Sequence, residues 1–204
     1  MCCNAQYNLA RSFWKVSFEY LMLVQNIARE TVTQGNTWFI TKDWQDGPVT
    51  EIEHAEGTSW SDHTIIIPLL FNLYHGIELL LKGFLLVTPG TDVKAKHTVQ
   101  LMSRQFYNAY PGEKELNGFL RKYTEEGNLP AILGEFLRDN AMPFDDLYQA
   151  LRYPSDRDFQ IFKKYIELKY RGSEGMPFFE ELHEDIEAIR VAAVRLGRFL
   201  KPKE

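Results

Sequence analysis

Four polar side chains stand at helical spacing in an otherwise apolar segment, and they are the residues best suited to chemistry. They are separated by three, three and four positions: Asn72, His75, Glu78 and Lys82. At about 100° of rotation per residue, this spacing places all four within about a third of a helix circumference. An imidazole, a carboxylate and an ammonium group on one helical face could bind a polar ligand and exchange protons with it.

This polar stripe has two interpretations. It could be a solvent-facing edge or a self-satisfied network, because Glu78 precedes Lys82 by four residues, which is the favourable order for an ion pair on one helix. It could instead line a cleft and, together with His97 at the start of the next predicted helix, present ionisable groups to a ligand.

Metal and catalytic motifs are largely missing. His75-x-x-Glu78 and Glu180-x-x-His183 each place two metal-ligand types on one helical face, but a di-metal bundle site needs two Glu-x-x-His pairs and two further Glu. The chain also lacks the glycine-rich phosphate loops, the His-Glu-x-x-His motif and the Gly-x-Ser-x-Gly motif. We therefore expect no bound metal, no cofactor and no catalytic residue.

Helical periodicity accounts for most of the chain, so we predict one all-α domain over residues 1–204, a helical bundle with long central helices. Long helices are predicted over 5–33, 65–87 and 177–200. Breaks rich in Pro, Gly and Asn separate shorter helices, which are predicted over 97–110, 113–126, 131–138, 145–152 and 156–171.

Two of the long helices carry apolar residues at heptad spacing. In the first helix we expect cover from more than one side, because a second set (Trp14, Phe18, Leu21, Ala28) widens the face formed by Leu9, Phe13, Val16, Tyr20, Leu23 and Ile27. The last helix has a seam that favours packing against an antiparallel neighbour in the bundle over a coiled coil between molecules: Phe179, Leu182, Ile186, Ile189, Ala193, Leu196 and Leu200.

The segment 34–62 loses this periodicity and is predicted to be an irregular loop. It could hold a weak hairpin formed by 37–42 and 49–53. Its tryptophans, Trp38, Trp44 and Trp60, have two interpretations, either packing of the loop onto the helices or an aromatic lid over a site.

Charge and hydropathy indicate which environments and partners the protein is suited to. The chain has 23 Lys and Arg against 28 Asp and Glu, and a formal net charge of -5, which argues against a surface built to coat nucleic acid or an anionic membrane. The helix predicted over 65–87 could span a bilayer by length, but Glu78 and Lys82 near its middle favour a buried helix of a soluble protein. With no secretory signal evident, we expect a cytoplasmic protein without a membrane partner.

Three segments, taken in order, resemble the HEPN superfamily. They are LYHGIELLLKGFL from Leu73, KHTVQLM from Lys96 and LRYP from Leu151. The resemblance implies an intracellular helical bundle, often dimeric, in a superfamily rich in RNases, toxin-antitoxin partners and phage-defence components. It covers roughly residues 65–155 directly and leaves residues 1–60 unexplained.

The nuclease members of that superfamily use an Arg followed after four to six residues by a His, paired across a dimer at a cleft that receives RNA. Arg152 has no His at that distance, so we expect a binding protein without catalysis. The expected ligand-binding residues combine the polar stripe with His97, Arg152 and Tyr153. Arg152 could grip a phosphate or carboxylate and Tyr153 could stack on a base.

Alternatives to this interpretation stay open. Arg152 could instead pair with Glu78 and lock two helices together. The protein could be a diverged RNase that uses Arg152 with His97 or His75, or a purely structural homodimer with the final seam as its interface. The expected partners are therefore a second copy, RNA or a nucleotide, or another protein.

Overall fold

Three long helices and a group of shorter ones form the molecule. The computed structural model describes residues 3–37, 51–91, 98–156 and 158–202, and for residues 3 and 51–54 it describes the backbone alone. These residues contain the following helices: α1 (Cys3–Thr33), α2 (Glu51–Thr58), α3 (Asp62–Leu86), α4 (Val99–Ala109), α5 (Lys114–Thr124), α6 (Ala131–Asp139), α7 (Leu147–Arg152) and α8 (Met176–Phe199). The predicted all-α bundle is confirmed.

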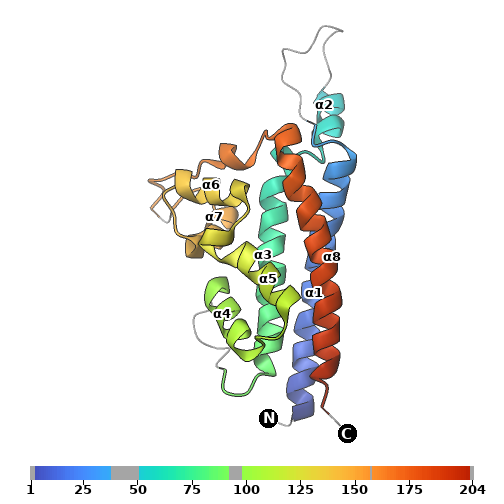
Figure 1. Ribbon diagram of the computed structural model, residues 1–204. Helices are drawn as coiled ribbons and strands as arrows, with labels where there is room; N and C mark the ends of the chain where they lie inside the picture. Colours follow the sequence, from blue (N-terminus) through green and yellow to red (C-terminus); the bar gives the residue numbers. More distant parts are fainter. Residues whose placement is uncertain (1–2, 38–50, 92–97, 157, 203–204) are drawn as a thin grey trace.

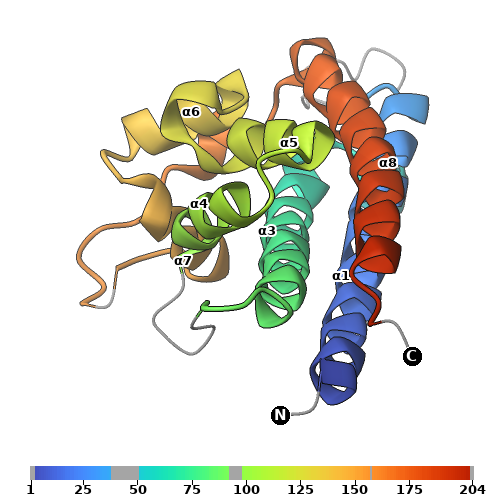
Figure 2. The same ribbon diagram turned by 60° about the horizontal axis from the view of Figure 1, so that its bottom comes forward.

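The long helices α1, α3 and α8 lie side by side, and α4 to α7 gather on the side of α3 that faces away from α1 (Figures 1 and 2). Helix α1 packs against both α3 and α8, whereas α4 and α7 pack against α3. The first and last helices therefore build one half of the bundle, and α3 joins it to the shorter helices.

Small residues let α1 and α3 approach closely. The Ser17 hydroxyl donates a hydrogen bond to the Gly76 carbonyl across the two helices, at 2.7 Å. The Trp14 indole occupies the space beside Gly83, where an added Cβ would lie 2.4 Å from Nε1. The side of α1 that faces α3 is therefore formed by these buried residues and their heptad neighbours Ala10, Leu21, Val24 and Ala28.

The expected cover of α1 is only partly confirmed. Trp14, Leu21 and Ala28 of the second predicted set are buried, as expected. Each residue of the first set comes one position before a buried residue, and these side chains stay exposed or partly exposed: Leu9, Phe13, Val16, Tyr20, Leu23 and Ile27. Both sets have the same spacing, so periodicity alone did not reveal which one approaches α3.

The seam of α8 packs inside the bundle, as expected. Its residues from Phe179 to Leu196 are buried in this single chain, and α8 lies against α1 and α5. A homodimer that used this seam would have to open the core, so this interface of the structural-homodimer alternative is excluded.

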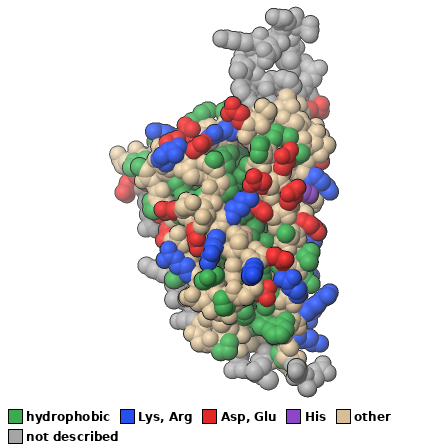
Figure 3. Space-filling model, in the orientation of Figure 1, with side chains coloured by type: hydrophobic (Ala, Val, Ile, Leu, Met, Phe, Trp, Pro, Cys, Tyr) green, Lys and Arg blue, Asp and Glu red, His purple; other side chains and the backbone are tan. Residues whose placement is uncertain are grey.

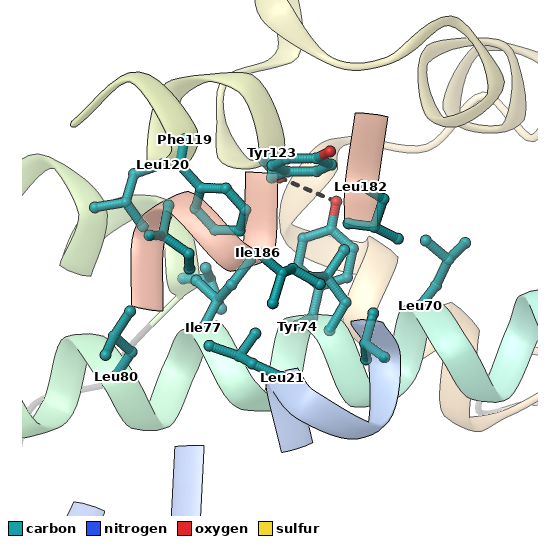
Figure 4. Close-up of a cluster of buried hydrophobic side chains, with 14 of the residues drawn as sticks. Leu21, Leu70, Tyr74, Ile77, Leu80, Phe119, Leu120, Tyr123, Leu182 and Ile186 are labelled. Carbon is teal, nitrogen blue, oxygen red and sulfur yellow. Dashed lines mark hydrogen bonds between the residues drawn. The ribbon is translucent and has the colours of Figure 1, made fainter. Parts of the chain in front are cut away.

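Helix α3 is the centre of the core. It is the one helix in the described residues that is long and apolar enough to cross a membrane, and 56% of its most apolar window is buried inside the molecule. Figure 4 shows Tyr74 of α3 donating a hydrogen bond to the Tyr123 carbonyl of α5 at 3.0 Å, among side chains from α1 and α8. The prediction of a buried core helix is confirmed.

Asp62 ties three parts of the chain together at the start of α3. Its buried carboxylate accepts hydrogen bonds from the backbone N–H groups of Tyr170 and Arg171, at 2.7 and 2.8 Å, and from the Asn36 amide at 2.9 Å. The Asn36 Oδ1 accepts in turn from the Asp62 N–H at 2.7 Å. The end of α1, the start of α3 and the segment before α8 therefore share one polar node.

Two predicted elements are wrong. Residues 156–171 do not form a helix but contain an antiparallel bridge between Ser155 and Phe162 and a short 3-10 helix, η3 (Tyr165–Leu168). The Asp156 carboxylate accepts from the N–H groups of Gln160 and Ile161, which competes with helical hydrogen bonding.

The predicted 34–62 loop also contains more helix than expected. The second strand of its predicted hairpin, over 49–53, is wrong because residues from Glu51 onward belong to α2. The first strand, over 37–42, lies outside the described residues apart from Thr37. Trp38 and Trp44 lie outside the described residues, and Trp60 is partly exposed. The two interpretations of the tryptophans therefore stay predictions.

Candidate functional site

The polar stripe of α3 forms as predicted. All four residues are partly exposed, and Glu78 lies at its centre, with Lys82 Nζ at 2.5 Å and His75 Nδ1 at 3.7 Å from its carboxylate oxygens. The Asn72 side-chain amide donates to the Pro68 carbonyl, four residues earlier in the same helix, at 2.7 Å. The stripe therefore offers a neutralised carboxylate and an imidazole, while Asn72 is used locally.

Tyr148 of α7 connects the stripe to the rest of the site. Its hydroxyl lies 2.9 Å from His75 Nδ1, at hydrogen-bonding distance. Burial raises the pKa of Tyr148, and the Glu78 charge raises it further, whereas Arg152 lowers it. The phenol therefore stays protonated at neutral pH, and its hydroxyl is able to donate to the imidazole.

Aromatic rings fix the orientation of His75. Tyr20 of α1 meets the imidazole edge-on, with ring centroids 4.6 Å apart. Phe71 and Tyr148 lie nearly parallel to it, at centroid distances of 6.1 and 6.4 Å. The imidazole is thus held by α1, α3 and α7 together, and its movement is restricted by packing.

Arg152 adds a cation at the end of α7. Its guanidinium lies 5.9 Å from the centroid of the Tyr148 ring and 5.5 Å from that of Tyr153, within the range of a cation–π contact. Among the described residues it forms no ion pair with a carboxylate, and Glu78 pairs with Lys82 and His75 instead. The alternative in which Arg152 locks two helices through Glu78 is therefore not supported.

A small cavity opens beside Tyr148. Its volume is about 160 Å³, and its lining combines apolar side chains with the polar groups of Glu78, Thr98, Asp145 and Tyr148. Ligand pockets that enclose a drug-sized molecule measure about 300–1,000 Å³, so this cavity admits only one end of such a ligand. Its carboxylates favour a hydrogen-bond donor at that end.

The structure brings most of the predicted site together. His75, Glu78 and Arg152 all surround Tyr148, and Lys82 neutralises Glu78. Tyr153 follows Arg152 but also lines a separate hollow of about 620 Å³ beside Phe159 and Phe162. His97 lies outside the described residues, so its predicted role stays a prediction.

Sequence reasoning missed Tyr148, Asp145 and Thr98. Tyr148 precedes Arg152 by four residues within the predicted helix 145–152, so helical spacing was a signal that the two side chains share a face. Asp145 and Thr98 had no such signal, because they reach the cavity from two separate segments.

Metal-binding chemistry finds no support in the described part of the chain, where no three His, Cys, Asp or Glu side chains gather as a metal would require. His183 contacts the Gln25 carbonyl at 3.3 Å through Nδ1. The Glu180-x-x-His183 spacing thus leads to packing between α8 and α1.

Comparison with protein-family models, curated proteins and solved structures finds no match to this chain. The HEPN resemblance therefore rests on the three sequence segments alone, and function has to be argued from the geometry of the site.

Proposed function

We propose that the protein is a HEPN-like binding module that holds a nucleotide, free or at an RNA end, at the α3–α7 surface without catalysing a reaction. The observation that carries the proposal is the pairing of two unlike recognition groups around Tyr148. Arg152 offers a cation that pairs with no carboxylate in the described part of the chain, and the cavity offers the carboxylates of Glu78 and Asp145.

A nucleotide has matching groups at its two ends. Its phosphate is an anion that a guanidinium can bind through two hydrogen bonds, and the amino group of adenine or cytosine donates to carboxylates. Because the cavity carries carboxylates, the phosphate belongs outside it, at Arg152, and a base edge fits inside. Tyr153, about half-exposed at 49%, is free to stack on an exposed ring.

The overall charge favours a small ligand over a long polyanion, because the chain carries a formal net charge of -5. On the described part of the face shown in Figure 3, red acidic and blue basic side chains are interspersed over α4 to α8. Long nucleic acids are bound by rows of cations that neutralise successive phosphates. A mixed surface, together with a site guanidinium that has no carboxylate partner among the described residues, supports recognition of one nucleotide unit.

Binding of labelled mononucleotides, measured by fluorescence anisotropy or calorimetry, tests the proposal. Cytidine monophosphate is expected to bind more tightly than uridine monophosphate, which lacks the amino group, and more tightly than inorganic phosphate. Arg152→Ala is expected to weaken binding about tenfold or more, because a hydrogen bond to a charged group contributes about 1.5–3 kcal/mol.

Two matched variants serve as controls. Arg138→Ala removes an exposed arginine of α6 that pairs with its neighbour Asp139 and should leave affinity unchanged. Asp145→Asn should reduce the preference for cytidine over uridine, whereas Asp146→Asn, next to it but outside the cavity, should not. Equal affinities of wild type and Arg152→Ala would reject the proposal.

A diverged RNase is the second candidate, and one observation favours it. His75 and Arg152 both contact Tyr148, so an imidazole and a guanidinium belong to one cluster. Against it, the His75 Nδ1 is engaged by Tyr148 and the imidazole is fixed between rings. Incubation with mixed RNA decides the matter, because cleavage that disappears in Arg152→Ala and in His75→Ala would establish an enzyme.

A further inference from the structure

A hollow of about 600 Å³ lies between α1 and α8, and none of its lining residues belongs to the candidate site. This volume falls in the range of about 300–1,000 Å³ that is typical of ligand pockets. Its apolar wall is formed by the rings of Trp14 and Phe18 of α1, together with Ala193 and Val194 of α8. We name this site the α1–α8 hollow.

Trp14 forms the base of the hollow. Its indole is 7% exposed, and Gly197 of α8 packs against its six-membered ring, where an added Cβ would lie 3.3 Å from Trp14 Cζ3. Along α1, Arg11, Lys15 and Phe18 follow one another at steps of four and three, so they lie on one face of the helix. These three side chains are exposed or partly exposed and therefore form the rim.

Three cations line the hollow, and no Asp or Glu of the described residues does. Arg11 and Lys15 come from α1 and Arg198 comes from α8; all three are exposed, and none forms an ion pair with another described residue. Elsewhere on α8, Arg190 and Arg195 do pair with carboxylates. The hollow thus gathers positive charge that the fold leaves uncompensated, in a chain whose net charge is -5.

The other polar groups of the lining do not suit a nucleobase. The Tyr7 hydroxyl donates to the Gly197 carbonyl at 2.8 Å, and the Ser12 hydroxyl donates to the Asn8 carbonyl at 3.3 Å. The amino group of a base would meet no carboxylate here, in contrast to the cavity beside Tyr148. An alkyl or aryl group needs only apolar contact, which the wall of the hollow provides.

We propose that the α1–α8 hollow binds a small amphiphilic anion. Its carboxylate or phosphate group lies at Arg11, Lys15 and Arg198, and its apolar part lies against Trp14 and Phe18. A guanidinium binds such an oxyanion through two parallel hydrogen bonds, and the lysine adds a point charge. A single molecule suits a concave site between two helices, whereas a membrane surface is bound by a protruding apolar helix face. This site is separate from the proposed nucleotide site.

Calorimetry of the full chain with four probes tests the proposal, with each amphiphile kept below its critical micelle concentration. Octyl phosphate is expected to bind at one saturable site. Octyl glucoside lacks the charge, octyltrimethylammonium reverses it, and inorganic phosphate lacks the apolar part. Each of these three is expected to bind at least about tenfold more weakly, because each loses either the charged hydrogen bonds or the apolar contact.

Variants of exposed residues locate the site without disturbing the core. Arg11→Gln combined with Arg198→Gln should weaken binding of octyl phosphate by about tenfold or more, with unchanged far-ultraviolet circular dichroism. Arg29→Gln is the matched control, because Arg29 is an exposed arginine of α1 outside the hollow. Val194→Glu places a negative charge in the lining and should abolish binding, whereas Val191→Glu, on an exposed valine of α8 outside the lining, should not.

The outcomes separate this proposal from its alternatives. Equal affinity of wild type and the double arginine variant, or binding of octyl glucoside as tight as that of octyl phosphate, would overturn it. Binding to vesicles of anionic lipid without binding of monomeric octyl phosphate would overturn it in favour of a membrane surface. Arg152→Ala should leave octyl phosphate binding unchanged, so failure of the nucleotide site and failure of the α1–α8 hollow are observed independently.

Discussion

At the scale of single residues, Tyr148 determines how the candidate site is assembled. Its hydroxyl reaches His75, its ring lies parallel to Phe71 at a centroid distance of 5.4 Å, and Arg152 packs over it. The phenol thus joins α3 to α7 by one polar and two aromatic contacts. Loss of the hydroxyl and loss of the ring should have different consequences.

Tyr148→Phe is expected to lower the free energy of unfolding by about 0.5–1.5 kcal/mol, the usual contribution of one hydrogen bond, because the ring contacts remain. Tyr148→Ala should cost more, since the stacked ring and the cation–π contact are lost as well. Urea denaturation of the three proteins measures both effects. A larger loss in Tyr148→Phe than in Tyr148→Ala would contradict the assignment of the ring contacts.

The buried Tyr123 should make the stability of the fold depend on pH in the alkaline range. Burial, followed by the charge of Asp185 and the hydrogen bond to it at 2.9 Å, holds the pKa of Tyr123 well above its ordinary value of 10.0. Above pH 10 the unfolded chain releases this proton while the folded protein keeps it, so stability is full at lower pH and falls as pH rises.

Denaturation midpoints measured from neutral pH to about pH 11 should show this fall. Tyr123→Phe should be less stable than wild type at neutral pH, because the bond to Asp185 is lost. The difference between the two proteins should shrink above pH 10. A difference that stays constant over this range would argue against a raised pKa for Tyr123.

At the scale of elements, the close approach of α1 and α3 depends on Gly83. An added Cβ would lie 2.4 Å from Trp14 Nε1 and 3.2 Å from the Ala10 carbonyl oxygen. Gly83→Ala is expected to destabilise the protein by about 1–3 kcal/mol, because overpacking forces the helices or the indole to move. Thermal and urea denaturation measure this loss.

Gly118 is the matched control. It lies within α5, is exposed, and an added Cβ would meet no atom within 4 Å. Gly118→Ala should therefore stabilise the protein by up to about 1 kcal/mol through helix propensity alone. A Gly83→Ala variant that is as stable as wild type would contradict the close packing of Trp14 against Gly83.

The same helices show how far sequence reasoning extends. Periodicity was sufficient for α1, α3 and α8, because long amphipathic segments have few competing structures. It failed over 156–171, where Phe159 and Tyr170 adopt positive φ and the Tyr165 hydroxyl bonds to the carbonyls of Ala150 and Tyr153. These contacts depend on distant residues, so local propensity did not indicate them.

For the site, sequence reasoning identified one helix but not its surroundings. The stripe from Asn72 to Lys82 follows from helical geometry, and the structure confirms it. The bond from His75 to Tyr148 joins residues 73 positions apart, and no motif predicted that contact. Helix α1 also offers two sets of apolar residues with the same spacing. Which set faces α3 depends on Gly76 and Gly83, which lie on α3 itself.

At the scale of the whole molecule, Asp62 holds the segment before α8 against the ends of α1 and α3. Asp62→Ala is expected to lower the free energy of unfolding by about 2 kcal/mol, because the buried Asn36 amide and the partly buried N–H group of Arg171 lose their acceptor. Exposed Asp158→Ala is the control and should have little effect. Equal midpoints for the two variants in urea would contradict the role of this node.

Helix α1 begins and helix α8 ends at the same pole of the molecule (Figure 1). The Tyr7 hydroxyl near the start of α1 donates a hydrogen bond to the Gly197 carbonyl near the end of α8, at 2.8 Å. A short linker could therefore join the two helices at this pole, and a circularly permuted chain opened in an exposed loop should keep the fold.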